Sequence, residues 1–103
     1  MIKVNIKEVN SNIEQIIISG HAGYDVHGKD IVCAAVSSIT ITTVNAILKL
    51  DSKAIDYVQD EKLIINVKKH DKVIFVLIQN MIDLLQELEK DYKKNIKINR
   101  EVS

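Results

Sequence analysis

The sequence predicts a two-layer α+β fold, in which a largely antiparallel sheet of about five strands carries two helices on one face. Three observations predict it. Apolar and polar residues alternate near both ends of the chain, residues 31–50 hold no charge before Lys49, and apolar residues between 74 and 88 recur every three or four positions. The predicted order is strand, strand, helix, strand, strand, helix, strand.

The first two strands are predicted from alternation around a polar turn. Ile2, Val4 and Ile6 alternate with lysine and asparagine, the turn lies at Asn10-Ser11-Asn12, and an apolar strand resumes over residues 13–19. Residues 20–30 lose this periodicity and collect glycines, histidines and charges. They therefore indicate an exposed loop.

Residues 31–50 are long enough to favour a helix over a strand, and Asp30 is placed to cap its first turn. Because this helix is nearly uncharged all round, we expect it to lie between the sheet and another surface, either the second helix or a partner chain. A membrane span is not expected, because polar residues interrupt the apolar run: Ser37, Ser38, Thr40, Thr42, Thr43 and Asn45.

The second half of the chain repeats the strand and helix signals. Residues 54–59 and 62–68 predict a hairpin that turns near Asp60-Glu61, and Ile96 and Ile98 belong to a closing strand. Asp71 can cap a second helix between them. We expect this helix to pack on the sheet through one apolar stripe, formed by Ile74, Leu77, Ile78, Met81, Leu84, Leu85 and Leu88.

The 103 residues fit a single domain over 1–103, so an active site must come from a few elements or be completed by a second copy. A homodimer is expected.

Fourteen basic residues balance fourteen acidic ones, so neither direct nucleic-acid binding nor membrane attachment is expected. The N-terminus resembles a strand rather than a signal peptide, and a single cysteine suits a reducing compartment, which predicts a cytoplasmic protein.

All three glycines, Gly20, Gly23 and Gly28, lie within residues 20–33 together with two of the three histidines and the only cysteine. Glycines let a backbone approach a ligand closely. A loop of this composition next to a strand end predicts a segment that closes over an extended peptide.

Cys33 is expected at the third helical position, where open N–H groups and the positive end of the helix dipole favour a thiolate. On its own, a cysteine followed by Ala34-Ala35 is often a buried apolar residue. His21 changes that interpretation, because a histidine at a strand end and a cysteine at a helix start can meet as a nucleophile and its base. His27 is a rival base, but it lies in the middle of the loop.

Asp30 is interpreted first as a helix cap and alternatively as a residue that orients His21 or the substrate. Ser37, one turn after Cys33, can touch the thiolate or a bound carbonyl, or bond back to the preceding turn. His70, beside Asp71, is interpreted as structural.

Other uses of the loop have weaker support. A zinc site built from His21, His27 and Cys33, with Asp25 as fourth ligand, lacks the paired spacing of zinc motifs. The glycines also lack the spacing of a Walker phosphate loop. No metal and no organic cofactor are therefore expected.

Two runs, Gly20-His21-Ala22-Gly23-Tyr24 and Gly28-Lys29-Asp30-Ile31-Val32-Cys33-Ala34-Ala35-Val36-Ser37, closely resemble the ribosomal-processing cysteine protease family, Prp. The resemblance implies an endopeptidase that removes a short N-terminal extension from the precursor of the large-subunit ribosomal protein numbered twenty-seven. It implies His21 and Cys33 as the catalytic dyad, Asp30 and Ser37 as supporting residues, and a homodimer. The N–H groups of Cys33 and Ala34 are expected to stabilise the oxyanion.

Two other functions stay open on sequence alone. The chain could be a non-enzymatic ribosome-assembly or binding module that docks through its lysine-bearing end, although that end is interpreted as a solvated surface. Its residues are Lys90, Lys93, Lys94, Lys97 and Arg100. Alternatively, Cys33 could serve as a redox sensor or an acyl-carrier site.

Overall fold

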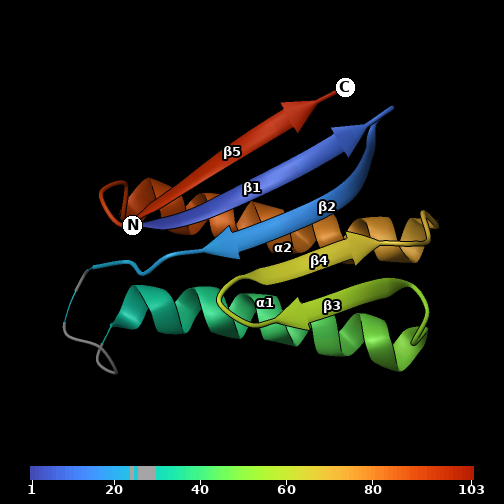
Figure 1. Ribbon diagram of the computed structural model, residues 1–103, viewed down its shortest axis with the longest axis horizontal. Coiled ribbons are helices and arrows are strands. Elements are labelled where there is room, and N and C mark those ends of the chain that lie inside the picture. Colours follow the sequence, from blue (N-terminus) through green and yellow to red (C-terminus); the bar gives the residue numbers. More distant parts are fainter. Residues whose placement is uncertain (24, 26–29) are drawn as a thin grey trace.

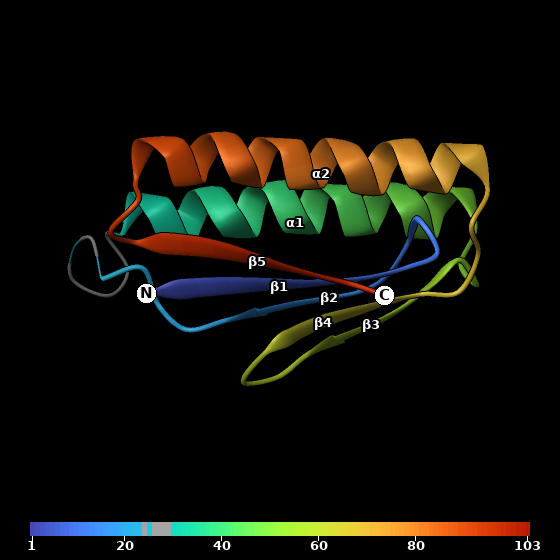
Figure 2. The same cartoon turned by 90° about the horizontal axis from the view of Figure 1, so that it is seen from above.

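The computed structural model describes residues 1–23, 25 and 30–103. Its elements are β1 (Ile2–Val9), β2 (Asn12–Ser19), α1 (Ile31–Leu50), β3 (Ile55–Gln59), β4 (Leu63–Val67), α2 (Lys72–Asp91) and β5 (Ile96–Val102). The five strands form one sheet in the order β3-β4-β2-β1-β5, and both helices cover the same face (Figures 1 and 2). The α+β prediction and the order of its elements are confirmed.

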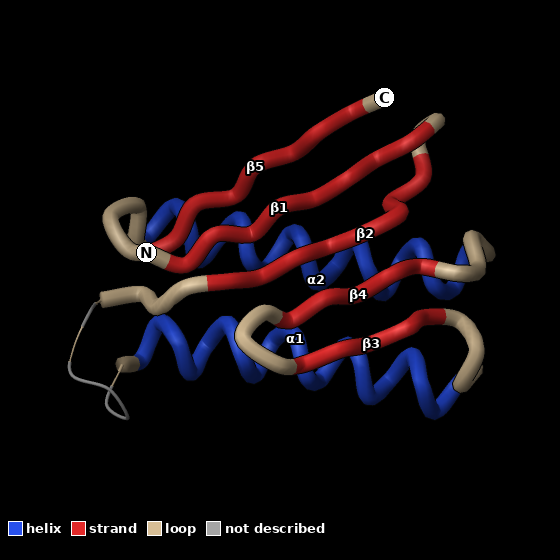
Figure 3. The backbone as a smooth tube through the Cα atoms, viewed as in Figure 1, coloured by secondary structure: helices blue, strands red, loops and turns tan. Residues whose placement is uncertain are grey.

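The sheet is mixed, because β5 runs parallel to β1 whereas the other neighbours are antiparallel (Figure 3). Side chains alternate across β1, so Ile2, Val4 and Ile6 are buried against the helices and Lys3 and Asn5 are exposed on the open face. The chain returns over the sheet through α2 before it adds β5 beside β1. This return brings the turn before β5 close to the start of β1, where the backbone N–H of Ile2 donates to the carbonyl of Asn95 at 2.8 Å.

A two-residue turn joins β1 to β2. Asn10 and Ser11 have φ values of 51° and 68°, as a type I′ hairpin turn requires, and Val9 pairs with Asn12 across it. The resulting register places Ser19, the last residue of β2, opposite Lys3 at the start of β1. The segment after β2 therefore begins beside the N-terminus of the chain.

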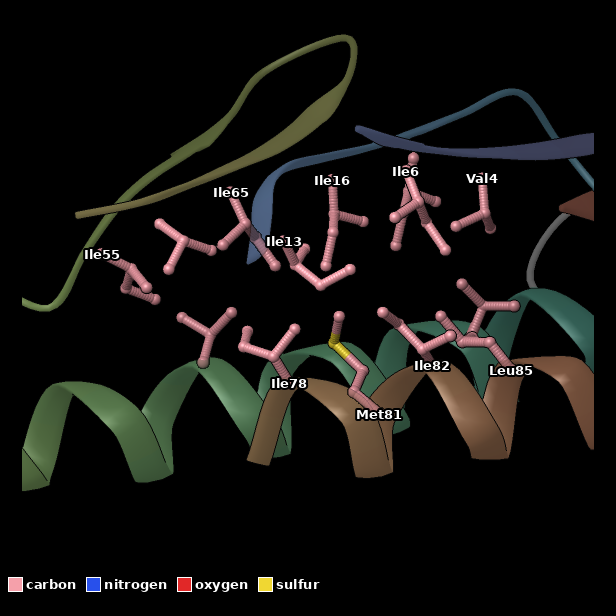
Figure 4. Close-up of a cluster of buried hydrophobic side chains, with 14 of the residues drawn as sticks. Val4, Ile6, Ile13, Ile16, Ile55, Ile65, Ile78, Met81, Ile82 and Leu85 are labelled. Carbon is pink, nitrogen blue, oxygen red and sulfur yellow. The ribbon is translucent and has the colours of Figure 1, made fainter. Parts of the chain in front are cut away.

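The core lies between the sheet and the helix layer and is almost entirely aliphatic (Figure 4). The sheet contributes Val4, Ile6, Ile16 and Ile65, which face Ile78, Met81, Ile82 and Leu85 of α2. Nonpolar side chains removed from water in this way are the main favourable term in folding.

The predicted apolar stripe of α2 differs from the structure at two positions. Leu84 is 40% exposed, whereas Ile82, which the stripe did not include, is fully buried. Leu77 and Leu88 lie at the edge of the core. Each residue of a helix turns its side chain by about 100°, so a stripe centred on Ile78 and Leu85 includes position 82 and leaves position 84 outside.

By length and composition alone, α1 could cross a membrane, but in this fold it packs on the sheet beside α2, with 33% of its apolar stretch buried. Its buried residues are Val32, Val36, Thr40, Thr43, Val44 and Ile47. Its opposite side, which we call the outer face of α1, carries the uncharged exposed residues Ala34, Ser38, Thr42 and Asn45.

Candidate active site

Two glycines shape the segment that follows β2. Gly20 has φ +86° and Gly23 has φ +70°, so left-handed backbone lies on both sides of His21 and Ala22. A Cβ at Gly20 would lie 2.3 Å from the carbonyl oxygen of Met1, whereas one at Gly23 would meet nothing within 4 Å. Gly20 is thus required by conformation and by space, and Gly23 by conformation alone.

Asp30 caps α1 as predicted. Its Oδ1 accepts hydrogen bonds from the backbone N–H groups of Val32 and Cys33, each at 3.0 Å. Its backbone is extended, with φ −76° and ψ 105°, as an N-cap residue requires. The cap fixes the first turn of α1 and sets Cys33 at its third position.

The two N–H groups expected as oxyanion donors both have hydrogen-bond partners at the helix start. The N–H of Cys33 is bonded to Oδ1 of Asp30, and the N–H of Ala34 donates to the Asp30 carbonyl at 3.1 Å. Both groups are therefore engaged within the helix start, because the cap residue satisfies the N–H groups that a helix terminus would otherwise leave open.

Cys33 contacts the segment that carries His21. Its Sγ accepts a hydrogen bond from the backbone N–H of Ala22 at 3.3 Å. Ala22 is only 2% exposed, and its carbonyl accepts from Nδ2 of Asn95 at 3.0 Å. The end of β2, the start of α1 and the turn before β5 are joined at this point.

Asn95 was absent from the residues that the sequence pointed to. It lies 73 positions from Ala22 and belongs to no recognisable motif. Only the parallel return of β5 beside β1 brings the two residues together.

A groove of about 710 Å³ runs past Cys33, a size typical of ligand sites. It opens between the first turns of α1, the end of β2 and the tip of the β3–β4 hairpin, which bends away from the helices (Figure 2). The sheet contributes Ile2, Ile18 and Leu63 to the lining, and α1 contributes Val36 and Thr40.

The groove collects most of the residues that the sequence pointed to. Those that line it are Gly20, His21, Gly23, Asp25, Asp30, Cys33, Ala34 and Ser37. His27 and Gly28 lie outside the described residues, so their predicted roles stay predictions. Across the described part of the chain, no group of three His, Cys, Asp or Glu side chains could hold a metal ion.

His70 lies away from this groove. Its Nε2 is 3.3 Å from Oε1 of Glu14. It lies two residues before α2, whose start is at the end of the molecule opposite the start of α1 (Figure 1). This contact agrees with the structural interpretation of His70.

A cysteine at a capped helix start and a histidine that lines the same groove are the pair of residues that cysteine proteases use for catalysis. The chain matches the model of the family "Cysteine protease Prp" over residues 1–97. The chain belongs to this family. It is therefore an enzyme rather than the non-enzymatic module considered above.

Known proteins agree with this assignment. The chain is similar to the ribosomal processing cysteine protease Prp of Staphylococcus aureus, with 34% identity over 91 residues, covering 84% of this chain and 86% of that protein. The Bacillus subtilis protein of the same description is 30% identical over 92 residues, covering 79% and 80%. A crystal structure of the S. aureus protease with a covalently linked product peptide has a TM-score of 0.93 at 31% identity, covering 98% of this chain and 100% of that chain.

Proposed function

We propose that this protein is an endopeptidase that removes the short N-terminal extension from the precursor of the large-subunit ribosomal protein numbered twenty-seven, with Cys33 as nucleophile and His21 as base. The observation that carries the proposal is that both residues line one groove, with the Cys33 sulfur 3.3 Å from the backbone nitrogen of Ala22, the residue after His21. The S. aureus relative is described as a ribosomal processing protease and binds a product peptide covalently, which supports the same chemistry here.

The reaction follows the two steps of covalent catalysis. His21 takes the proton of the Cys33 thiol, the sulfur attacks the scissile carbonyl carbon, and the peptide C–N bond breaks as His21 returns the proton to the leaving amine. A thioester remains on Cys33. His21 then takes a proton from water, the resulting hydroxide attacks the thioester, and the carboxylic acid leaves as the thiol is restored.

Two further residues support this chemistry in the proposal. Asp30 acts through the helix cap, because its bonds to the N–H groups of Val32 and Cys33 hold the nucleophile at the mouth of the groove. Ser37 is exposed one turn further along α1 and lines the same groove, where its hydroxyl can bond a substrate carbonyl.

Mass spectrometry of the precursor after incubation with the protein tests this function. We expect wild type to shorten the precursor at one site, and Cys33→Ala and His21→Ala each to lower the rate by about a thousandfold or more. His70→Ala is the matched control, because His70 lies outside the groove. Cutting at the wild-type rate by either groove variant would overturn the dyad, and an uncut precursor with wild type would overturn the substrate.

We also propose that the enzyme works as a homodimer in the cytoplasm. A reducing medium keeps the Cys33 thiol free, and the uncharged outer face of α1 suits contact with a second copy. Recovery of the protein in a membrane or extracellular fraction would contradict the compartment.

A further inference from the structure

Acyl transfer needs a donor aimed at the oxygen that becomes negative when the sulfur attacks. The first two candidates at the helix start, the N–H groups of Cys33 and Ala34, are both bonded to Asp30. A donor that is not already used by the helix cap would come from another described segment that faces the sulfur.

The backbone N–H of Ala22 faces it. It donates to Sγ of Cys33 at 3.3 Å in the free protein, so it already points at the position that a Cys33 thiolate would occupy. When the sulfur bonds the scissile carbon, negative charge leaves the sulfur and appears on an oxygen attached to that carbon. An N–H that points at the sulfur is close to this oxygen and can transfer its hydrogen bond to it.

Ala22 is held from its other side by Asn95. The side-chain amide of Asn95 donates to the Ala22 carbonyl at 3.0 Å, and Ala22 is 2% exposed, so water competes little for this bond. Asn95 is itself anchored, because its carbonyl accepts the Ile2 N–H at 2.8 Å and its own N–H donates to the Tyr92 carbonyl at 2.9 Å. A line of hydrogen bonds thus runs from β1 and the end of α2 to the sulfur.

We propose that the backbone N–H of Ala22 is the oxyanion donor and that Asn95 is a positioning residue that holds it in place. This inference rests on the proposed function, since it assumes that Cys33 is the nucleophile. Asn95 acts through Ala22 and does not touch the substrate in this assignment.

Asn95→Ala and Asn95→Ser test the positioning role, with Asn99→Ala as control. Asn99 carries the same amide four positions further on, within β5, but it bonds the exposed Asn5 side chain at 3.2 Å, away from the site. We expect kcat on the precursor to fall about tenfold or more in both Asn95 variants, because removing an oxyanion donor outright costs about a hundredfold to a thousandfold. KM should stay near the wild-type value, and Asn99→Ala should match wild type.

A peptide aldehyde provides a readout that a merely structural role would not move. Cys33 adds to the aldehyde and forms a hemithioacetal whose oxygen mimics the oxyanion. We expect the Asn95 variants to bind the aldehyde about tenfold more weakly, while their affinity for the matching peptide alcohol is unchanged. In wild type, the amide proton resonance of Ala22 should shift when the aldehyde binds.

Three results would overturn the inference. They are an unchanged kcat in both Asn95 variants, an equal loss of affinity for the aldehyde and the alcohol in those variants, or an Ala22 amide resonance that does not shift when the aldehyde binds to wild type. If Asn95→Ala does not fold, the kinetics of Asn95→Ser and the Ala22 amide resonance of wild type still test the inference. Each of these failures leaves wild-type cutting intact, whereas failure of the proposed function abolishes cutting by wild type itself.

Discussion

At the scale of single residues, the site depends on backbone that only certain side chains permit. His21 and Ala22 lie between two left-handed glycines, and Gly20 also packs against the Met1 carbonyl. The backbone position of His21, the proposed base, therefore depends on Gly20 having no side chain.

Replacing Gly20 tests this dependence. In Gly20→Ala the new Cβ would lie 2.3 Å from the Met1 oxygen, so the backbone must shift. We expect a loss of unfolding free energy above about 2 kcal/mol, since the left-handed conformation alone costs about 1–2 kcal/mol, and a marked fall in kcat. Gly23→Ala, which has space for its Cβ, should lose only the conformational part. Equal losses in urea unfolding would contradict this account.

Two threonines of α1 differ in how their hydroxyls are satisfied. Within the described part of the chain, Oγ1 of the fully buried Thr40 has no hydrogen-bond partner, whereas Oγ1 of Thr43 donates to the Ile39 carbonyl at 3.0 Å. We expect Thr40→Val to raise the unfolding free energy by about 1 kcal/mol relative to Thr43→Val, because an unsatisfied buried hydroxyl costs about 1–3 kcal/mol. Urea unfolding of both variants measures the difference, and no difference would contradict it.

At the scale of elements, the orientation of α2 decides which leucines and isoleucines stabilise the fold. Ile82→Ala should lower the unfolding free energy by about 2–5 kcal/mol, the usual range for a buried aliphatic residue. Leu84→Ala, at a side chain that is 40% exposed, should cost under about 1 kcal/mol. Denaturant unfolding distinguishes the two, and a larger loss at Leu84 would mean that α2 is rotated about its axis.

The end of α1 is tied to the segment after β4 through Asp51. The hydrogen bond from Lys69, with a smaller contribution from the Lys53 N–H, holds the pKa of the Asp51 carboxyl below its ordinary value of 3.8. The folded state therefore favours the carboxylate, and its contribution is complete above pH 3.8 and lost as pH falls through the lower folded pKa. We expect Asp51→Asn to be less stable than wild type at neutral pH. The difference in urea midpoint should vanish in strong acid, and one that persists there would contradict the cause.

At the scale of the whole molecule, we propose the outer face of α1 as the surface that contacts a second copy. It carries Ala34, Ser38, Thr42 and Asn45 without a charge, beside Ile31, which is 52% exposed. We expect a dimer in sedimentation equilibrium that Ser38→Glu converts to monomer, because a charge buried in an interface without a partner is costly. Asn5→Glu, on the open face of the sheet, is the control. A monomeric wild type, or a Ser38→Glu dimer of unchanged strength, would contradict this interface.

Local signals in the sequence were enough for the elements and for part of the site. Alternation in β1, the caps at Asp30 and Asp71, and the residues at the β1–β2 turn act over a few neighbours, so they can be interpreted without knowing the rest of the fold. The same holds for Cys33 at a helix start and His21 at a strand end. The structure brings both to one groove, and their catalytic roles stay a prediction.

Other features depended on packing between distant segments. The parallel pairing of β5 with β1, the choice of Ile82 over Leu84, and the contact of Asn95 with Ala22 all arise when α2 and β5 dock on the first hairpin. The use of the Cys33 and Ala34 N–H groups by Asp30 likewise appears only with atomic positions. Sequence alone determined which elements form and which chemical groups they carry, because those choices are local. Tertiary structure decided which groups meet, because contacts across 73 residues depend on how the whole chain packs.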